Sequence, residues 1–322
     1  MRWVLGLVRF ETLQVYHTMP SSHQKKQKVI VIVGQTASGK SALGVEIARA
    51  VEGEIISADS RQVYRGCDIG TGKITRRDMK GVPHHLIDVT SPRKAFTAAQ
   101  FREKGRNVIT DIGKRGKVPI IAGGTGFYID TLLFDDELPA AAPDSTLRAF
   151  LEKKTAAELF ARLSESDPER AASIDRNNKR RLIRALEIAE TLGHVPKRAT
   201  RRTSPYDILW IGIRLPDGLL REQIHDRNAD MIAKGLVAEV KRLKESRISD
   251  KRMYELGFEY RFALDYLKGE INRETMLERM NTKTWHYAKR QKTWFQRNAD
   301  ISWFAPTDTV HIMATVWSFL AD

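Results

Sequence analysis

The sequence predicts an α/β fold in which helices cover a parallel sheet, with an inserted helical subdomain and a helical C-terminal region. Three observations predict this class. Short β-rich runs alternate with helical patterns from residue 28 onward, residues 136–202 are helical in pattern throughout, and one further strand precedes long basic helices. With 322 residues, the chain can bury the core of one α/β domain and still carry a smaller unit.

The N-terminal extension comprises residues 1–27. Its apolar stretch, residues 3–8, is too short for an ordinary signal-peptide core. A mitochondrial presequence and a true start at Met19 are the other interpretations. We expect a disordered extension or a start-site artefact.

The predicted core comprises residues 28–135 and consists of repeated strand–helix units. Strands are expected at residues 29–33, 54–57, 85–89 and 118–122, and helices at residues 41–51, 98–112 and 127–134. Because parallel strands need helical crossovers, this order predicts a doubly wound sheet.

The second half of the chain is mainly helical. An Ala/Pro-rich stretch at residues 138–144 opens the insertion, residues 136–204. A strand at residues 207–215 and helices at residues 218–246 and 273–298 then complete the core within residues 205–304, and residues 305–322 are expected to form a tail.

A phosphate-binding loop follows the first strand and opens the first helix. Its spacing and context are those of a P-loop, so the core is expected to resemble that of P-loop NTPases. Backbone N–H groups of such a loop surround one anion, a lysine adds positive charge, and a hydroxyl binds Mg²⁺. The residues are Gly34, Gln35, Thr36, Ala37, Ser38, Gly39, Lys40 and Ser41, with Ser41 as the Mg²⁺ ligand.

The ligand of this loop stays open on spacing alone. ATP or another nucleotide would fit, and a diphosphate ester satisfies the same geometry. Ordinary P-loop NTPases carry an acidic Mg²⁺ ligand at the end of a neighbouring strand. Here that strand ends in Gly123–Gly124, which argues against an NTPase, although Asp88 is a possible substitute.

Two more turns are expected at the same edge of the sheet. Asp59 follows the second strand, where open α/β sheets bind their ligands, so it is placed either for proton transfer or as a helix N-cap. Thr125 follows Gly123–Gly124 in a turn that either approaches a ligand closely or only connects strand to helix.

Charge and cysteine content narrow the class of partner and compartment. Fifty-four Lys and Arg against 40 Asp and Glu give a net charge of +14. Taken alone, this charge indicates a polyanionic partner such as nucleic acid and a solvated basic surface about equally. The single cysteine, Cys67, indicates a reducing compartment, and no apolar run reaches the length of a membrane span. His84 and His85 point to opposite faces of a strand, which disfavours a shared metal.

Several motifs together resemble the tRNA dimethylallyltransferases, or IPP transferase family, over about residues 28–304. They are residues 34–41 (GQTASGKS), 59–64 (DSRQVY), 68–73 (DIGTGK), 84–88 (HHLID), 123–128 (GGTGFY), 180–187 (RRLIRALE), 235–240 (GLVAEV) and 288–294 (AKRQKTW). Departures from the family pattern occur at Gln35, Gly72, Phe258, Trp285 and Gln223.

The resemblance implies transfer of a dimethylallyl group from dimethylallyl diphosphate to N6 of the adenine at position 37, next to the anticodon. It implies Mg²⁺ as cofactor, a cytoplasmic enzyme that is a monomer without membrane contact, and the P-loop as the diphosphate site. Asp59 would be the general base, Thr125 would lie in the reaction channel, and Arg227 would reach the diphosphate. The insertion would be a lid on the anticodon stem-loop of tRNA, with contacts from Asp59, Ser60, Arg61, Gln62, Thr125, Arg148, Arg180, Arg181, Leu182, Ile183, Arg184, Gly257 and Phe258.

Three other functions compete with this interpretation. A P-loop kinase or ATPase would use Asp88 for Mg²⁺. A prenyltransferase that acts on free AMP, ADP or ATP would need neither the +14 charge nor the insertion. A non-enzymatic RNA-binding protein would not need a complete P-loop.

Overall fold

A computed structural model describes residues 26–135, 139–141, 144–196 and 203–322. Residues 1–25 of the predicted extension lie outside this part of the chain.

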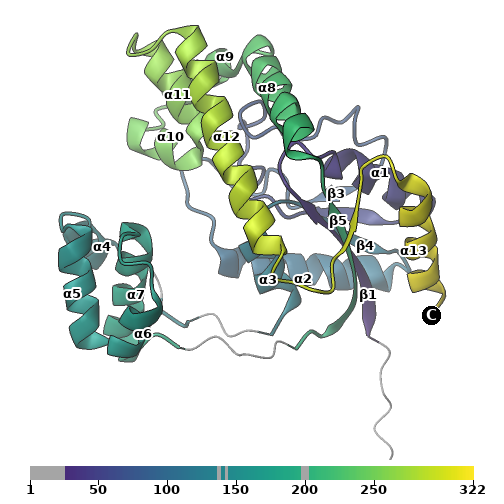
Figure 1. Cartoon of the computed structure of the whole chain (residues 1–322), viewed down its shortest axis with the longest axis horizontal. Coiled ribbons are helices and arrows are strands. Elements are labelled where there is room, and N and C mark those ends of the chain that lie inside the picture. Colours follow the sequence, from purple (N-terminus) through teal and green to yellow (C-terminus); the bar gives the residue numbers. More distant parts are fainter. Residues whose placement is uncertain (1–25, 136–138, 142–143, 197–202) are drawn as a thin grey trace, which may run out of the picture.

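The core is a six-stranded sheet in which every paired strand is parallel. The strand order is β3-β2-β4-β1-β5-β6. The strands are β1 (Gln27–Gly34), β2 (Glu54–Ser57), β3 (His84–His85), β4 (Pro119–Ala122), β5 (Tyr206–Ile213) and β6 (Ser302–Phe304). The α/β class with a parallel, P-loop-like sheet is therefore confirmed, and the carboxyl ends of all strands meet at one edge (Figure 1).

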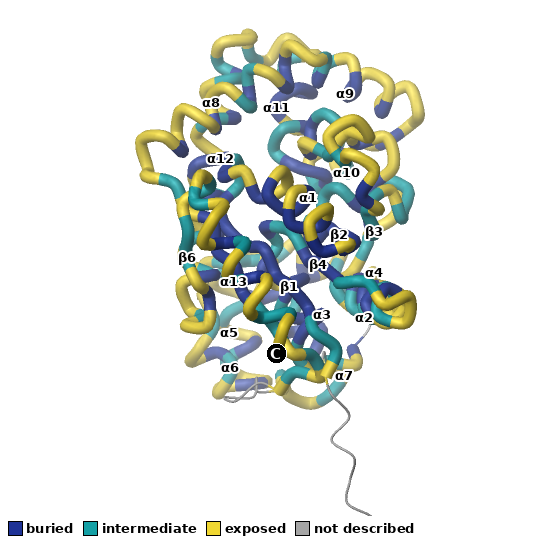
Figure 2. Tube along the Cα trace, turned by 90° about the vertical axis from the view of Figure 1, so that its right-hand side faces the viewer, coloured by how far each residue is buried: buried dark blue, intermediate teal, exposed yellow. Residues whose placement is uncertain are grey.

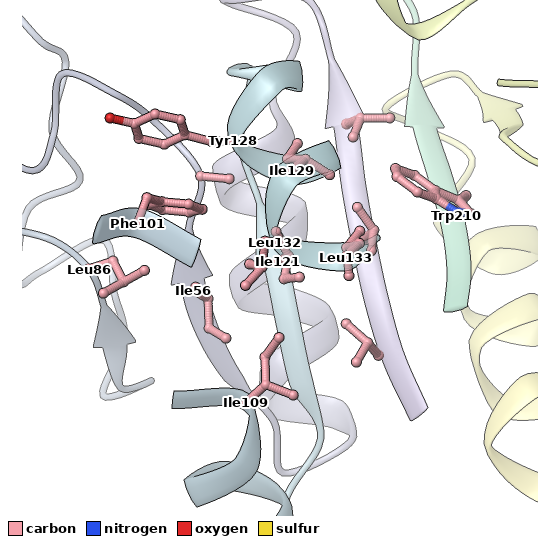
Figure 3. Close-up of a cluster of buried hydrophobic side chains, with 14 of the residues drawn as sticks. Ile56, Leu86, Phe101, Ile109, Ile121, Tyr128, Ile129, Leu132, Leu133 and Trp210 are labelled. Carbon is pink, nitrogen blue, oxygen red and sulfur yellow. The ribbon is translucent and has the colours of Figure 1, made fainter. Parts of the chain in front are cut away.

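Both faces of the sheet are buried at its centre, which is why residues 29–33 of β1 and 119–122 of β4 form continuous apolar runs. Along β1, Val29, Val31 and Val33 pack on one side, whereas Ile30 and Ile32 pack on the other. The valine side is covered by α2 (Ala98–Lys114) and α3 (Gly126–Leu133), whose Phe101, Ile129 and Leu132 are labelled in Figure 3. The isoleucine side is covered by α1 (Lys40–Ala50) and α13 (Thr309–Ala321).

Three predicted elements differ from the structure. The strand expected at residues 85–89 is only the two-residue β3, because Leu86 and Asp88 have left-handed backbones with φ of 61° and 57°. The helix expected at residues 218–246 is two helices, α8 (Asp217–Ala233) and α9 (Leu236–Glu245), because Gly235 between them has φ of 99°.

The segment expected to be a tail, residues 305–322, contains a core helix instead. In α13, Ile312 and Val316 are completely buried against the sheet. The strand β6 precedes it and pairs with β5, so the C-terminal residues complete the sheet and cover it.

The insertion has its own small core. It contains α4 (Ser145–Leu151), α5 (Ala156–Ser166), α6 (Pro168–Ser173) and α7 (Lys179–Leu192), which lie apart from the sheet in Figure 1. At its root the outgoing and returning chains meet, because Asp135 N–H donates to Thr203 O at 3.0 Å and Ser204 Oγ donates to Leu133 O at 2.7 Å.

A second helical lobe stands above the carboxyl edge of the sheet. It is formed by α8, α9, α10 (Asp250–Leu256), α11 (Phe258–Leu267) and the first part of α12 (Arg273–Phe295), and α12 then runs down to the sheet (Figure 1). In Figure 2, the dark blue buried residues lie along the central strands and on the sides of the lobe helices that face one another. None of the helices in the described ranges is long and apolar enough to cross a membrane.

Candidate active site

The turns after β1, β2 and β4 enclose one cavity of about 270 Å³ at the carboxyl edge of the sheet. P-loop residues 36–41 form one wall, Asp59 and Gln62 come from the turn after β2, and Gly123 and Gly124 come from the turn after β4. Arg227 from α8 and Tyr287 and Gln291 of α12 also line it, as do Ser57 of β2, His84 of β3, and Gly72 and Ile74 between these strands. The three turns expected at one edge of the sheet therefore face a single space.

The P-loop begins with a close backbone contact. Gly34 has φ of 145°, and a Cβ at this position would collide with the carbonyl oxygen of Ile213 on β5. Gln35, where family members usually have proline, is 2% exposed and donates from Nε2 to Ala288 O on α12 at 3.3 Å. This hydrogen bond fixes the start of the P-loop to α12.

Lys40 is buried at the base of the cavity. Its ammonium group donates to Gln35 O and to Ser38 Oγ, the latter at 3.5 Å. Burial, together with the positive charge of Arg227, lowers the pKa of Lys40 to about 7, although the carboxylate of Asp59 opposes this shift. An anion in the cavity would favour its charged form.

Ser41 is the first exposed residue of α1 and also lines the cavity. A hydroxyl group beside phosphate oxygens suits Mg²⁺, which keeps several waters and takes few protein ligands. No cluster of three or more His, Cys, Asp or Glu that could hold a metal occurs among the described residues. The donor set thus fits an ion held mainly by Ser41 and a diphosphate.

Asp59 is not a helix N-cap, because turns rather than a helix follow it. Its Oδ1 accepts the Arg61 N–H at 2.8 Å, which orients the carboxyl group, and the residue lines the cavity opposite Lys40. This leaves Oδ2 without a hydrogen-bond donor within the described ranges. The N-cap interpretation of Asp59 is therefore wrong, and proton transfer by this residue stays a prediction.

Arg227 reaches across the cavity mouth from α8. Its guanidinium group donates to Thr36 Oγ1 in the P-loop and, at 3.4 Å, to Thr71 O. It lies against Gly72, where a Cβ would collide with Nη2. The predicted cation is thus beside the P-loop, 191 residues away in sequence.

Thr125 supports the turn that carries Asp59 but does not line the cavity itself. Its Oγ1 accepts the Ser60 N–H at 3.0 Å and donates to Ser60 Oγ at 3.4 Å. Beside it, Tyr287 of α12 lines the cavity, and burial and the charge of Asp59 raise the pKa of this phenol to about 12.

Several residues of the cavity were not among the predicted site residues, including His84 of β3 and Tyr287 and Gln291 of α12. Tyr287 and Gln291 lie one turn apart on α12, and Gln291 is 4% exposed. Gln291 Oε1 accepts the Thr36 N–H at 2.7 Å, and its Nε2 donates to Gly124 O at 2.9 Å, so it joins two of the three turns. The available signal for Gln291 was its place in the 288–294 motif of the resemblance.

Asp88 is not placed like the Mg²⁺ ligand of an NTPase. It pairs with Lys73 at 2.6 Å and is absent from the cavity lining. The observation that favoured a kinase or ATPase is therefore removed.

The residues predicted to contact tRNA fall into three groups. In the core, Arg61 Nη1 donates to Glu255 O, and Gln62 bridges Ser57 Oγ at 3.1 Å and Gly72 O at 3.3 Å. The Gly257–Phe258 turn opens α11.

The remaining predicted contacts lie in the insertion. Arg148 and Arg180 line a cleft of about 670 Å³, whose other wall includes Lys251 and Tyr254 of α10. Arg148 also forms a two-point ion pair, at 3.0 and 2.7 Å, with Glu187, which is 1% exposed.

Not every residue of the predicted 180–184 segment faces this cleft. Arg180 and Arg181 are exposed, whereas Arg184 donates to Ala141 O at 2.7 Å. Leu182 is completely buried in the insertion core, and we assign it a packing role. Ile183 is 6% exposed and touches the cleft with little of its surface.

Comparisons with known proteins agree on one family. Residues 62–298 match a profile described as IPP transferase. The tRNA dimethylallyltransferase of Bacillus subtilis is 40% identical over 293 residues, 88% of this chain and 93% of that protein. A crystal structure of the tRNA isopentenylpyrophosphate transferase from Bacillus halodurans matches with a TM-score of 0.70 and 37% identity over 92% of this chain and 97% of that one. A eukaryotic dimethylallyltransferase acting on tRNA matches with a TM-score of 0.77 and 28% identity over 92% and 80% of the two chains.

Proposed function

Since the chain belongs to the IPP transferase family, it is a prenyl-transferring enzyme of tRNA, and we propose the donor, the target atom and the residues that act on them. The donor is dimethylallyl diphosphate and the acceptor is N6 of the adenine at position 37, next to the anticodon. The products are N6-(dimethylallyl)adenosine in tRNA and diphosphate.

The observation that carries this proposal is one cavity of about 270 Å³ that contains both a phosphate-binding loop and the carboxyl group of Asp59. An adenine amine is a weak nucleophile because its lone pair is delocalised into the ring. Activation must therefore fall on the leaving diphosphate, and a proton acceptor must stand near the amine.

The leaving group would be stabilised by the P-loop N–H groups, Lys40 and Arg227. Groups placed in advance to meet charge that grows in the transition state contribute about 3–4 kcal/mol each. When bound at Ser41, Mg²⁺ would supply further positive charge to the diphosphate oxygens.

Asp59 would accept the proton that the acceptor amine loses. The bond between the allylic carbon and the diphosphate oxygen breaks, the bond from that carbon to N6 forms, and one N6 proton passes to the Asp59 carboxylate. General base catalysis of this kind contributes about 10²–10⁴-fold.

The tRNA would bind across the cleft between the insertion and α10. Arg148, Arg180 and Lys251 supply positive charge for phosphates, and Tyr254 supplies an aromatic surface. The target adenine must leave its stack to enter the cavity, which costs least in a single-stranded loop. We also propose that the enzyme works as a monomer and that it works in the cytoplasm. The buried, free thiol of Cys67 supports a reducing compartment.

The test is a prenylation assay with purified protein, Mg²⁺, dimethylallyl diphosphate and unmodified tRNA that carries adenines next to the anticodon. Digestion and mass spectrometry should detect dimethylallyl adenosine, and Asp59→Asn should abolish it while the P-loop still binds the donor. Prenylation of AMP but not of tRNA would move the acceptor to free nucleotides, and ATP hydrolysis without prenyl transfer would refute the proposal.

A further inference from the structure

A buried carboxylate outside the cavity holds the loop on which Arg227 rests. Glu239 of α9 is 1% exposed and accepts four hydrogen bonds. Its Oε2 accepts the N–H groups of Asp68 and Ile69, each at 2.9 Å. Its Oε1 accepts the Gly70 N–H at 3.0 Å and the Tyr260 hydroxyl at 2.8 Å.

Three consecutive backbone N–H groups on one carboxylate fix the conformation of the 68–72 loop. Such buried donors have few alternative partners, so loss of the acceptor would leave each of them desolvated and unsatisfied. The packing agrees, because a Cβ at Gly70 would lie 2.6 Å from Cζ of the Tyr260 ring. The loop can therefore hardly shift without moving Glu239 or Tyr260.

The other end of the same loop contacts Arg227. Thr71 O accepts a hydrogen bond from Arg227 Nη2 at 3.4 Å, and the Cα of Gly72 lies directly against that guanidinium nitrogen. Gly72 O also accepts from Gln62 Nε2, on the turn that carries Asp59. The loop thus sets where the arginine side chain can lie at the cavity mouth.

Tyr260 joins this arrangement to the predicted tRNA contact. It is completely buried in the first turn of α11, two residues after Phe258, and its hydroxyl binds the same Glu239 oxygen as the loop. One carboxylate therefore connects the turn expected to touch tRNA with the loop that holds the cation expected to meet the diphosphate.

We propose that Glu239 is a positioning residue for the reaction, which holds the 68–72 loop so that Arg227 meets the departing diphosphate. Glu239 touches neither substrate and acts through Arg227. The inference rests on the proposed role of Arg227.

The test is a double-mutant cycle of Glu239→Gln and Arg227→Ala, read as single-turnover prenyl transfer at saturating tRNA and donor. Glu239→Gln puts an amide NH₂ against backbone donors and displaces the loop. Because a shift of about 1 Å in a catalytic group costs about 10²-fold, we expect a loss of about 100-fold in rate when Arg227 is present. In the Arg227→Ala background, the same change should cost less than about threefold.

Controls separate this role from simple destabilisation. Glu54→Gln removes another buried carboxylate, which is 2% exposed and lies at the start of β2, away from the cavity. This variant should transfer at the wild-type rate at a temperature where all variants are folded. The tRNA dissociation constant of Glu239→Gln should stay within about threefold of wild type. If Glu239→Gln does not fold, Tyr260→Phe removes only one of the four hydrogen bonds to the carboxylate and should show the same dependence on Arg227.

The outcomes are distinct. If Arg227→Ala alone transfers at the wild-type rate, the proposed role of Arg227 fails. If Arg227→Ala is impaired but Glu239→Gln has no effect, or has an equal effect in both backgrounds, only the positioning role is overturned.

Discussion

Affinity for the prenyl diphosphate should depend on pH through Lys40. Burial and Arg227 lower the pKa of Lys40 to about 7 in the free protein, and a bound diphosphate beside the ammonium group should raise it again. The protonated form binds the anion, so the apparent dissociation constant grows with the neutral fraction as pH rises above 7. For a free-state pKa of about 7 and a bound-state pKa back at the ordinary value of 10.5, the dissociation constant should rise about 50-fold between pH 7 and pH 9.

Isothermal titration with dimethylallyl diphosphate from pH 7 to pH 9 measures this dependence. Phosphate esters complete their second ionisation at a pKa of about 6, so the donor charge hardly changes in this range. Other charged groups lie near Lys40. Burial raises the pKa of Glu259 to about 7, and the charges of Asp59 and Arg227 act on both Lys40 and Glu259. The variant Lys40→Arg stays positively charged across this pH range, so it removes only the titration at position 40. Its dissociation constant should therefore hardly change between pH 7 and pH 9. A wild-type profile that is equally flat, or an arginine variant as steep as wild type, would refute the reasoning.

Further predictions concern catalysis, tRNA binding and acid stability. Asp59→Asn should lower the single-turnover rate by about 10²–10⁴-fold with little change in tRNA affinity, and unchanged turnover would exclude it as the base. Arg148→Ala should weaken tRNA binding in a filter assay and also lower the free energy of unfolding by about 1–3 kcal/mol, because its carboxylate partner is buried. The exposed Arg180→Ala should affect only binding, and equal thermal stabilities of the two variants would contradict this distinction. Hydrogen bonding to Arg115 lowers the pKa of Glu54 from 4.5 to about 2, so its stabilising contribution should be complete above pH 4.5 and lost as pH falls toward 2. Thermal melts should therefore show a smaller loss between pH 4.5 and pH 2 for Glu54→Gln than for wild type.

The sequence was most informative where local chemistry determines structure. A P-loop needs Gly34 for a positive φ beside β5, and it must end in a lysine and a hydroxyl, so its position and class could be read directly. Asp59 and Thr125 follow apolar strands, and parallel strands bring their carboxyl ends together. The convergence of these turns was therefore predictable without coordinates.

Features that depend on distant contacts could not be predicted in this way. Gln291 is buried only because α12 descends onto the P-loop, and nothing in the local pattern of that helix indicates where it lands. β6 has three residues and pairs with β5, from which the whole C-terminal lobe separates it in sequence, so no local pattern indicates this pairing. Leu86 and Asp88 belong to a run with strand propensity, but their left-handed backbones end β3 early.

The two hydrogen bonds between the outgoing and returning segments at the root of the insertion show how the insertion is joined to the core. Asp135 and Thr203 are hydrogen-bonded neighbours, and the insertion packs around a core of its own. A gene segment whose product begins and ends at the same point can enter a coding sequence in one recombination event without changing strand order. Every strand of the parallel sheet lies outside the insertion, so joining residues 135 and 203 directly would leave the strand order and the P-loop unchanged.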